Sequence, residues 1–246
     1  MSRTRTRLII LGVLTFVVGL AVSFPARIAY QWFAPSDAAL SGITGTVWSG
    51  RARHASIGGV YLRDLHWRMR PQAIFSGGIG YAMQGSPAPG TLSADVVIGL
   101  TGSVSLSDIV GAVPLESIEK IANMPGLRGR LDVNMERLVF KDGLPVAADG
   151  EIEVLRLVAP LVYRGELGGY RVEFFTQNSG VMASVEDTDG VVDLAGSLQV
   201  TPDRNYTFIG LVAPKANTPG KLKEQMRFLG TANDRGQHEL RLEGTL

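Results

Sequence analysis

The chain has 246 residues, 45% of them hydrophobic, which is enough for one sizeable domain or two small ones. Its 24 Lys and Arg residues balance 23 Asp and Glu residues, so a net charge of +1 gives no global attraction to nucleic acid or acidic partners. The absence of cysteine excludes structural disulfides, thiolate metal sites and a cysteine nucleophile. A glycine count of 30 and a charged fraction of 19% favour a turn-rich β protein.

The N-terminus combines a basic tail with an apolar run. Arg3, Arg5 and Arg7 precede residues 8–26, which carry no charge. At about 1.5 Å per residue this run nearly spans a hydrocarbon core of about 30 Å, and the arginines before it predict a cytoplasmic N-terminus. We therefore expect a single transmembrane anchor, with a cleaved signal peptide as the alternative. The anchor residues are Leu8, Ile9, Leu11, Leu14, Phe16, Val17 and Leu20.

Four segments follow from this interpretation. They are a cytoplasmic basic tail over residues 1–7, the anchor over 8–26, a linker over 27–42 and a periplasmic β-rich domain over 43–246. Within the linker, Tyr30, Trp32 and Phe33 are typical of an interfacial aromatic belt.

Apolar and polar residues alternate from residue 43 onward, which predicts strands with one dry and one wet side. Val60, Leu62, Leu65, Trp67 and Met69 share the dry side of one strand, with a slip near Arg63. The wet side carries Asp64, His66, Arg68 and Arg70. Gly58 and Gly59 indicate a hairpin turn before this strand. In total we expect about ten to thirteen strands in an antiparallel, curved sheet or a sandwich.

Two segments break the alternation and predict short helices. Residues 114–121 begin with proline and place Leu115, Ile118 and Ile121 on one face. Residues 218–229 carry an apolar stripe and are followed by Gly230, which is suited to ending a helix.

The sequence carries no motif that indicates catalysis. No phosphate-binding loop or Gly-x-Ser-x-Gly elbow is present, and His54, His66 and His238 are far apart on predicted strands. Ser117 and Lys120 match Ser-x-x-Lys, but the motifs that accompany it in penicillin-recognising enzymes are missing, so a solvated helix face is the favoured interpretation. We expect no catalytic, cofactor or metal site and no enzyme activity.

Arginine and tryptophan are concentrated at the start of the β-rich domain. Arg51, Arg53, Arg63, Arg68 and Arg70 lie around Trp48 and Trp67. Such a pattern is able to bind phosphates and stack bases, but the expected location beyond a membrane argues against nucleic acid. Anionic lipid headgroups or a protein partner remain, beside plain surface charge. The tryptophans either pack the first hairpin or anchor a partner, and the apolar side of Trp67 favours packing.

The order of several short motifs resembles protein N of the bacterial type II secretion system. The motifs are Gly45-Thr46-Val47-Trp48-Ser49-Gly50, then Leu65-His66-Trp67 with Arg70-Pro71, then residues 126–131 and 150–153, and finally Leu229-Gly230, Asp234-Arg235-Gly236 and the ending Glu243-Gly244-Thr245-Leu246. One departure is at Val154-Leu155, where many relatives are expected to have a tryptophan.

The resemblance implies a non-catalytic inner-membrane component of the machine that exports folded proteins across the outer membrane. Its implied partners are other subunits of the inner-membrane platform or the secretin. A more distant resemblance to AsmA-like envelope proteins leaves a lipid-binding or lipid-transfer module as the alternative. An open curved sheet with an apolar concave face supports lipid binding, whereas a filled sandwich supports a scaffold.

Overall fold

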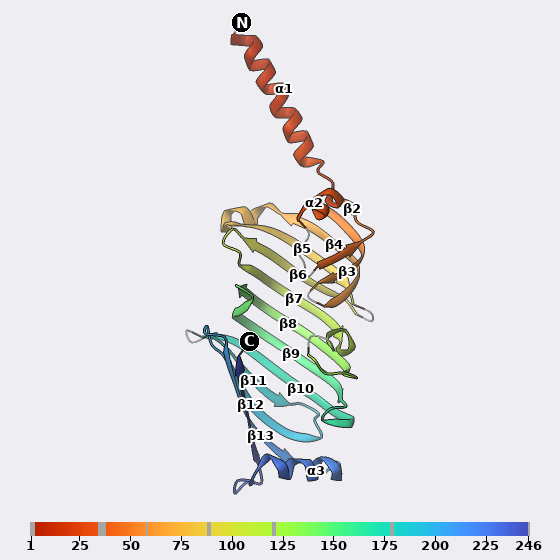
Figure 1. The fold of residues 1–246 in the computed structure, drawn as a ribbon, viewed down its shortest axis with the longest axis vertical. Helices are drawn as coiled ribbons and strands as arrows, with labels where there is room; N and C mark the ends of the chain where they lie inside the picture. Colours follow the sequence, from red (N-terminus) through yellow and green to blue (C-terminus); the bar gives the residue numbers. More distant parts are fainter. Residues whose placement is uncertain are drawn as a thin grey trace.

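The protein is mainly β, with one long antiparallel sheet and few helices (Figure 1). The structure is a computed structural model that describes residues 3–33, 38–57, 59–87, 90–119, 122–177 and 180–245. Its helical segments are α1 (Arg3–Val22), α2 (Ala26–Phe33), η1 (Pro71–Ser76), η2 (Leu115–Ile118), α3 (Gly220–Met226) and η3 (Arg227–Leu229). The strands are β1 (Ala38–Ser41), β2 (Thr44–Gly45), β3 (Ser49–Ile57), β4 (Val60–Arg70), β5 (Gly78–Ser86), β6 (Leu92–Gly99), β7 (Val104–Pro114), β8 (Arg128–Lys141), β9 (Leu144–Ala159), β10 (Tyr163–Gln177), β11 (Gly180–Asp187), β12 (Val192–Val200), β13 (Asn205–Pro214) and β14 (His238–Thr245).

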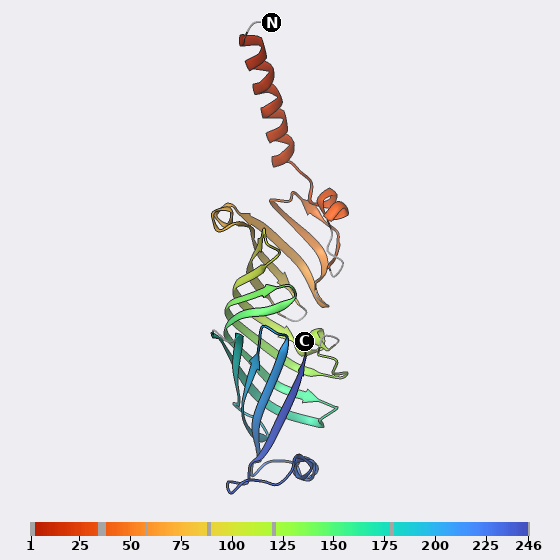
Figure 2. The same ribbon diagram turned by 60° about the vertical axis from the view of Figure 1, so that its left-hand side comes forward.

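Every strand from β3 to β14 pairs antiparallel with its neighbours in the sequence. At the N-terminal end, β1 and the two-residue β2 both pair with β3. All the strands that the structure describes therefore form a single sheet, and the prediction of a mainly β antiparallel fold is confirmed. The sheet twists and curls along its length instead of folding into two layers (Figure 2), so the sandwich alternative is wrong.

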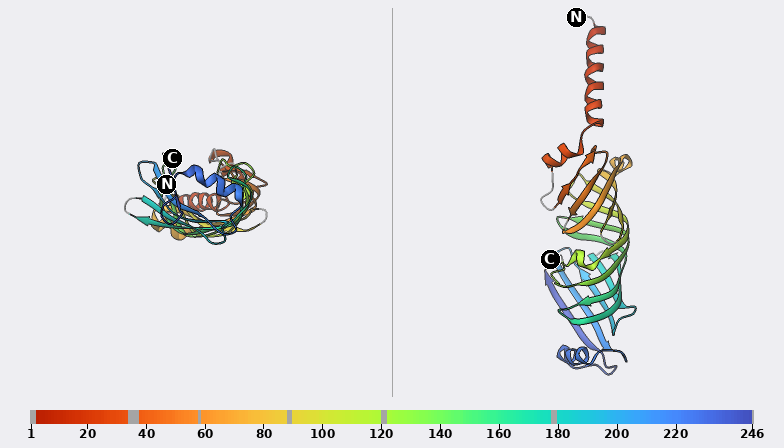
Figure 3. Two further views of the ribbon diagram at one scale, coloured as in Figure 1. Left: turned by 90° about the horizontal axis from the view of Figure 1, so that it is seen from below. Right: turned by 90° about the vertical axis from the view of Figure 1, so that its right-hand side faces the viewer.

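One face of the sheet, which we call the inner face, is apolar from end to end. Three clusters of buried side chains lie along it: Ala52, Ala55, Leu62 and Leu65; then Ile109, Met135, Ala148, Val181 and Val200; then Leu115, Leu127, Ala159, Leu167, Tyr170, Val192, Val212, Leu222 and Met226. Leu92 packs against both the first and the second cluster. The sheet curls around this face, and α3 lies across its open side (Figure 3).

The strand slip expected near Arg63 is confirmed as a β-bulge. The register of β4 against β5 shifts between Arg63 and His66. Asp64 lies at the shift with a positive φ of 49°, a conformation that aspartate tolerates better than most residues. Because of this extra residue, Leu62 and Leu65 both reach the inner face.

The predicted helix at residues 218–229 is confirmed as α3 followed by the 3₁₀ turn η3. The helix expected over residues 114–121 is instead the single 3₁₀ turn η2, and Lys120 and Ile121 lie outside the described residues. Sequence patterning missed α2 and η1, which are short and lie between longer signals. The linker expected over residues 27–42 therefore contains most of α2 and all of β1.

Helix α1 projects away from the sheet at its N-terminal end (Figure 1). The helix ends at Val22, and Pro25 precedes the start of α2, so the uncharged run over 8–26 is not one continuous helix. Within the described parts of the chain, no helix has both the length and the apolar character needed to cross a membrane.

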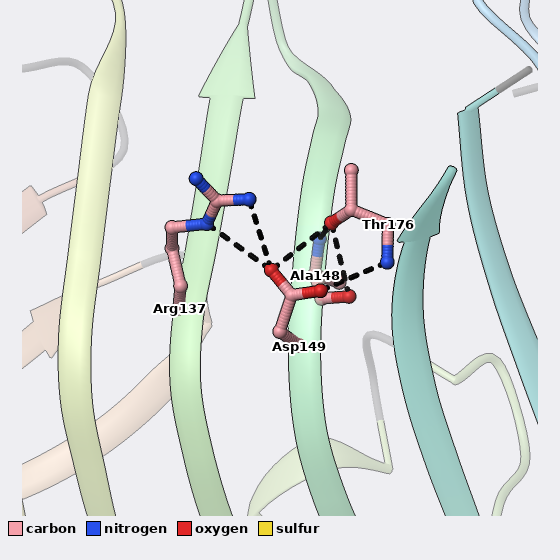
Figure 4. Close-up of polar contacts among 4 residues, drawn as sticks. All are labelled: Arg137, Ala148, Asp149 and Thr176. Atoms are coloured by element: carbon pink, nitrogen blue, oxygen red, sulfur yellow. Dashed lines mark hydrogen bonds and ion pairs between the residues drawn. The ribbon is translucent and has the colours of Figure 1, made fainter. Parts of the chain in front are cut away.

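A polar cluster joins three strands in the middle of the sheet (Figure 4). The pairing of β9 with β10 ends at Gly150 and Phe174, and beyond that point Thr176 replaces the regular ladder. Its Oγ1 accepts a hydrogen bond from the N–H of Ala148 at 3.0 Å and donates to Asp149 at 3.1 Å. The backbone N–H of Thr176 also donates to Asp149 at 2.9 Å. Arg137 Nε on β8 donates to the same carboxylate at 3.1 Å.

These contacts determine the pKa of Asp149. Burial alone would raise it, but the hydrogen bonds from Thr176 and the charge and hydrogen bond of Arg137 lower it below the ordinary value of 3.8. A carboxyl group with a lowered folded pKa stabilises the fold above its ordinary pKa. That contribution is lost as the pH falls through the folded-state pKa.

Replacing Thr176 by valine should lower the free energy of unfolding by about 2 kcal/mol, because the buried N–H of Ala148 and the carboxylate of Asp149 each lose a partner. Denaturant unfolding measured near neutral pH tests the size of the loss. Repeating it at a pH below the lowered pKa of Asp149 should show a smaller difference, since protonation removes the charge that the hydroxyl stabilises. The control Thr207→Val, on β13, should change stability far less, and equal losses would contradict this role for Thr176.

Candidate functional site: the joint between the N-terminal helix and the sheet

The Gly45–Gly50 stretch connects the N-terminal helices to the sheet, and we call it the joint. Trp48 donates from Nε1 to the carbonyl oxygen of Ala21 at 2.7 Å. That carbonyl belongs to the last turn of α1, where carbonyls lack partners within the helix. Val47 N–H donates to the Phe24 carbonyl oxygen at 3.1 Å, and Pro25 forms an isolated bridge with Thr46. The start of the sheet thus holds the chain on the C-terminal side of α1.

Trp67 on β4 supports the joint from the inner face. Its Nε1–H donates to the carbonyl oxygen of Thr46 at 3.1 Å. Its ring covers Gly50, where a Cβ atom would lie 2.4 Å from Cζ2 of the indole. Only glycine allows the ring to approach this closely, which explains on steric grounds why the last position of the Gly-x-Val-Trp-Ser-Gly motif, Gly50, is a glycine. Met69 N–H closes the arrangement by donating to the Trp48 carbonyl oxygen at 2.6 Å.

The predicted arginines fall into two groups, of which only Arg68 and Arg70 meet a tryptophan. Arg51, Arg53 and Arg63 surround a shallow hollow of about 380 Å³ together with His54 and Asp64. Arg68 and Arg70 line a second hollow, of about 650 Å³, together with Trp67 and Gly50 of the joint. Arg70 forms an ion pair with Asp95, and its side chain remains 55% exposed. The stretch therefore combines the tryptophan joint with Arg68 and Arg70 beside it and with a separate basic surface at Arg51, Arg53 and Arg63.

The histidines and the Ser-x-x-Lys pair do not assemble into a site. His54 stacks on Tyr61, whose hydroxyl is 2.6 Å from His54 Nδ1, and His238 Nδ1 lies 2.8 Å from the Gly230 carbonyl oxygen. Across the described residues, no group of three or more side chains suited to holding a metal ion comes together. Ser117 lies in η2, but Lys120 is outside the described part of the chain.

An apolar groove beneath α3 is a feature that the sequence analysis missed. Its volume is about 640 Å³, and Gln225 is the one polar residue besides Tyr170 among the described residues that line it. Leu161 and Phe228 at the groove are 66% and 89% exposed. The lining comes from β9 to β14 and from α3, so no local pattern in the sequence indicates it.

An ion pair beside this groove fixes the connection from β13 to α3. Lys215 pairs with Asp187, whose side chain is only 9% exposed. Asp187 also accepts a hydrogen bond from Leu194 N–H at 2.9 Å. Burial would raise the pKa of Asp187, but Lys215 and Leu194 lower it below its ordinary value. Burial and the nearby Asp187 charge raise the pKa of Tyr170 to about 12, so its hydroxyl stays protonated and donates to the Leu167 carbonyl oxygen.

Together, the single sheet and the tryptophan joint define a β-sheet protein tethered to an N-terminal helix. The chain belongs to the family of type II secretion system protein N, whose family model matches residues 37–241. The resemblance inferred from the motifs is thereby confirmed. Family membership supports a role as a component of type II secretion, associated with the bacterial envelope.

The chain is similar to three curated proteins named type II secretion system protein N. It is 23% identical to the Aeromonas hydrophila protein, over 92% of this chain and 93% of the relative. It is also 23% identical to the Vibrio cholerae and Pectobacterium carotovorum proteins, with at least 94% of each chain covered. No solved structure matches the chain. Nothing in these comparisons supports the distant resemblance to AsmA-like proteins.

Proposed function

We propose that the protein is a non-catalytic, inner-membrane component of the type II secretion system that supports the export of folded proteins across the outer membrane. The family match over most of the chain is the observation that carries this role. The joint adds a physical reason, because it couples the N-terminal helix to a sheet large enough to contact other subunits. The proposed partners are subunits of the inner-membrane platform or the secretin.

The proposed anchor is α1, with the sheet on the periplasmic side. Its apolar side chains are exposed over the length of the helix, and Leu8 and Phe16 are 65% and 66% exposed. Exposed apolar side chains gain most from a lipid environment. Residues 8–22 rise about 22 Å, which is shorter than a typical core of about 30 Å. Local thinning of the bilayer and extension of the flanking arginines accommodate such a short segment.

Genetic deletion and complementation test the secretion role. Loss of the gene should leave type II substrates in the periplasm, and the full chain should restore their appearance outside the cell. A photo-reactive residue in place of Arg68, beside the joint, should crosslink to another secretion subunit. Unchanged secretion after deletion, with no such crosslink, would contradict the proposed role.

Alkaline extraction of membranes tests the anchor separately. The full chain should stay in the membrane pellet, and Leu11→Arg combined with Phe16→Arg should release it into the supernatant. The control pair Leu11→Ile and Phe16→Leu should stay in the pellet. Release of the unaltered chain would show that α1 does not hold it in the bilayer.

The apolar groove beneath α3 is a specific observation in favour of the alternative role in lipid binding, since an open sheet with an apolar inner face meets the shape criterion. The comparisons favour secretion over this alternative. Native mass spectrometry of the purified chain distinguishes the two: a bound phospholipid that disappears in Leu161→Asp would support the lipid role.

A further inference from the structure

Two turns of the sheet meet to form a protruding apolar tip. The first turn is η1, between β4 and β5, and the second connects β6 to β7. The N–H of Leu100 in the second turn donates to the carbonyl oxygen of Gly77 at the end of the first, at 3.2 Å. Phe75 is 93% exposed, Leu100 is 85% exposed and Ile74 is 58% exposed. We call these three residues the apolar tip.

The two turns that carry the apolar tip contain no charged residue, and Arg70 and Asp95, which line a hollow beside η1, form an ion pair with each other. The sequence has no Asp, Glu, Lys or Arg from Pro71 to Ala94, nor from Val96 to Ser107. Other turns of the sheet do carry charge, as Asp142 does between β8 and β9 and Asp203 and Arg204 do between β12 and β13. Large exposed apolar side chains on uncharged turns are costly in water and mark a contact surface.

The backbone of η1 is suited to a medium with little water. Gly77 N–H donates to the carbonyl oxygen of Ile74 at 3.1 Å, and Gly77 adopts the left-handed conformation that closes the turn. The free-energy cost of removing a turn from water is lower when its backbone polar groups are hydrogen-bonded to each other than when they are open to solvent.

The turns between β4 and β5 and between β6 and β7 lie towards the end of the sheet from which α1 departs (Figures 1 and 2). Helix α2 lies at the same end, with Trp32 67% exposed and Phe33 76% exposed. Tyr30, the third aromatic residue of α2, instead donates to the Ala38 carbonyl oxygen at 3.1 Å. Two separate groups of exposed apolar side chains therefore flank the exit of α1.

We propose that the apolar tip inserts into the interfacial layer of the same bilayer that holds α1. This inference rests on the proposed anchor and adds a second point of membrane contact. A bilayer fits better than a protein partner because the tip is convex and uncharged, and it lies beside a helix whose aromatic residues are typical of membrane interfaces. Together with α2, the tip fixes the tilt of the sheet against the membrane.

Site-directed fluorescence on the full chain tests this inference. The chain has no cysteine, so single substitutions allow an environment-sensitive dye to be attached at one position at a time. The labelled variants are Phe75→Cys and Leu100→Cys in the tip, Phe16→Cys in α1 and Phe228→Cys at the far end of the sheet. Each is reconstituted in vesicles of phosphatidylethanolamine and phosphatidylglycerol, with circular dichroism to verify folding.

Nitroxide-labelled lipids should quench the dye at positions 75 and 100 and leave it bright at position 228. Iodide dissolved in the water should quench the dye strongly at position 228 and weakly at positions 75 and 100. Quenching by lipid at position 16 but not at position 75 or 100 would overturn the proposed membrane contact of the apolar tip and leave the proposed anchoring by α1 intact. Absence of lipid quenching at position 16 would overturn the anchor itself. If the dye at position 75 is protected from iodide only when other secretion subunits are added, and lipid does not quench it, the tip contacts a protein partner instead.

Discussion

Replacing Trp67 by alanine should lower the free energy of unfolding by about 3 kcal/mol, at the lower end of the range for removal of a packed tryptophan because its side chain is only partly buried. The substitution removes the ring that covers Gly50 and the N–H that pairs with the Thr46 carbonyl oxygen. It also weakens the packing of the first apolar cluster on the inner face.

Two matched variants separate these effects. Trp67→Phe keeps part of the packing and loses the hydrogen bond, so its loss should be intermediate. Trp32→Ala removes a tryptophan that is 67% exposed and should change stability by less than about 0.5 kcal/mol. Denaturant unfolding of the full chain in detergent, followed by far-ultraviolet circular dichroism, measures all three. A loss for Trp67→Ala below about 0.5 kcal/mol would show that Trp67 has no structural role at the joint.

Replacing Lys215 by methionine should cost about 3 kcal/mol near neutral pH, because it leaves the buried carboxylate of Asp187 without its cation. In the unaltered protein, the lowered pKa of Asp187 means that its contribution is present above the ordinary pKa and is lost as the pH falls through the folded-state value. The variant should therefore approach the unaltered protein in stability as the pH falls through the lowered pKa of Asp187.

The double variant Lys215→Met with Asp187→Asn should recover part of the loss, since it removes the unpaired charge. Lys223→Met, on the exposed side of α3, is the matched control and should have little effect. Thermal unfolding measured across a range of pH tests the whole series. A loss in Lys215→Met that does not change with pH would show that the charge of Asp187 is not the cause.

Alternation predicted the strands because each has one face on the apolar clusters and one in water. The same pattern could not distinguish an open sheet from a sandwich, since a strand shows one dry and one wet side in both. The slip at Arg63 did indicate a real bulge, because an extra residue shifts the period of the side chains.

The candidate site was only half visible in the sequence. Alternation placed Trp67 on the apolar side of its strand. The hydrogen bond from Trp48 to Ala21 joins residues 27 positions apart, and a pattern of neighbouring residues cannot predict such a contact. The same holds for the groove beneath α3, whose walls come from six strands and a helix. Alternation predicted that Arg68 and Arg70 lie on the solvent side of their strand. It could not predict the ion pair of Arg70 with Asp95, because that contact depends on the pairing of β5 with β6.

The strand order has a consequence for how the protein reaches its folded state. From β3 onward each strand pairs with the strand made just before it and the strand made just after it. Such contacts close short loops, and chains dominated by short loops fold faster than β proteins whose partners are distant in sequence. A chain emerging from its N-terminus can therefore add one hairpin after another to a growing edge. Helix α3 and strand β14 follow the other strands of the third apolar cluster in the chain and complete it, so consolidation of that cluster awaits their synthesis.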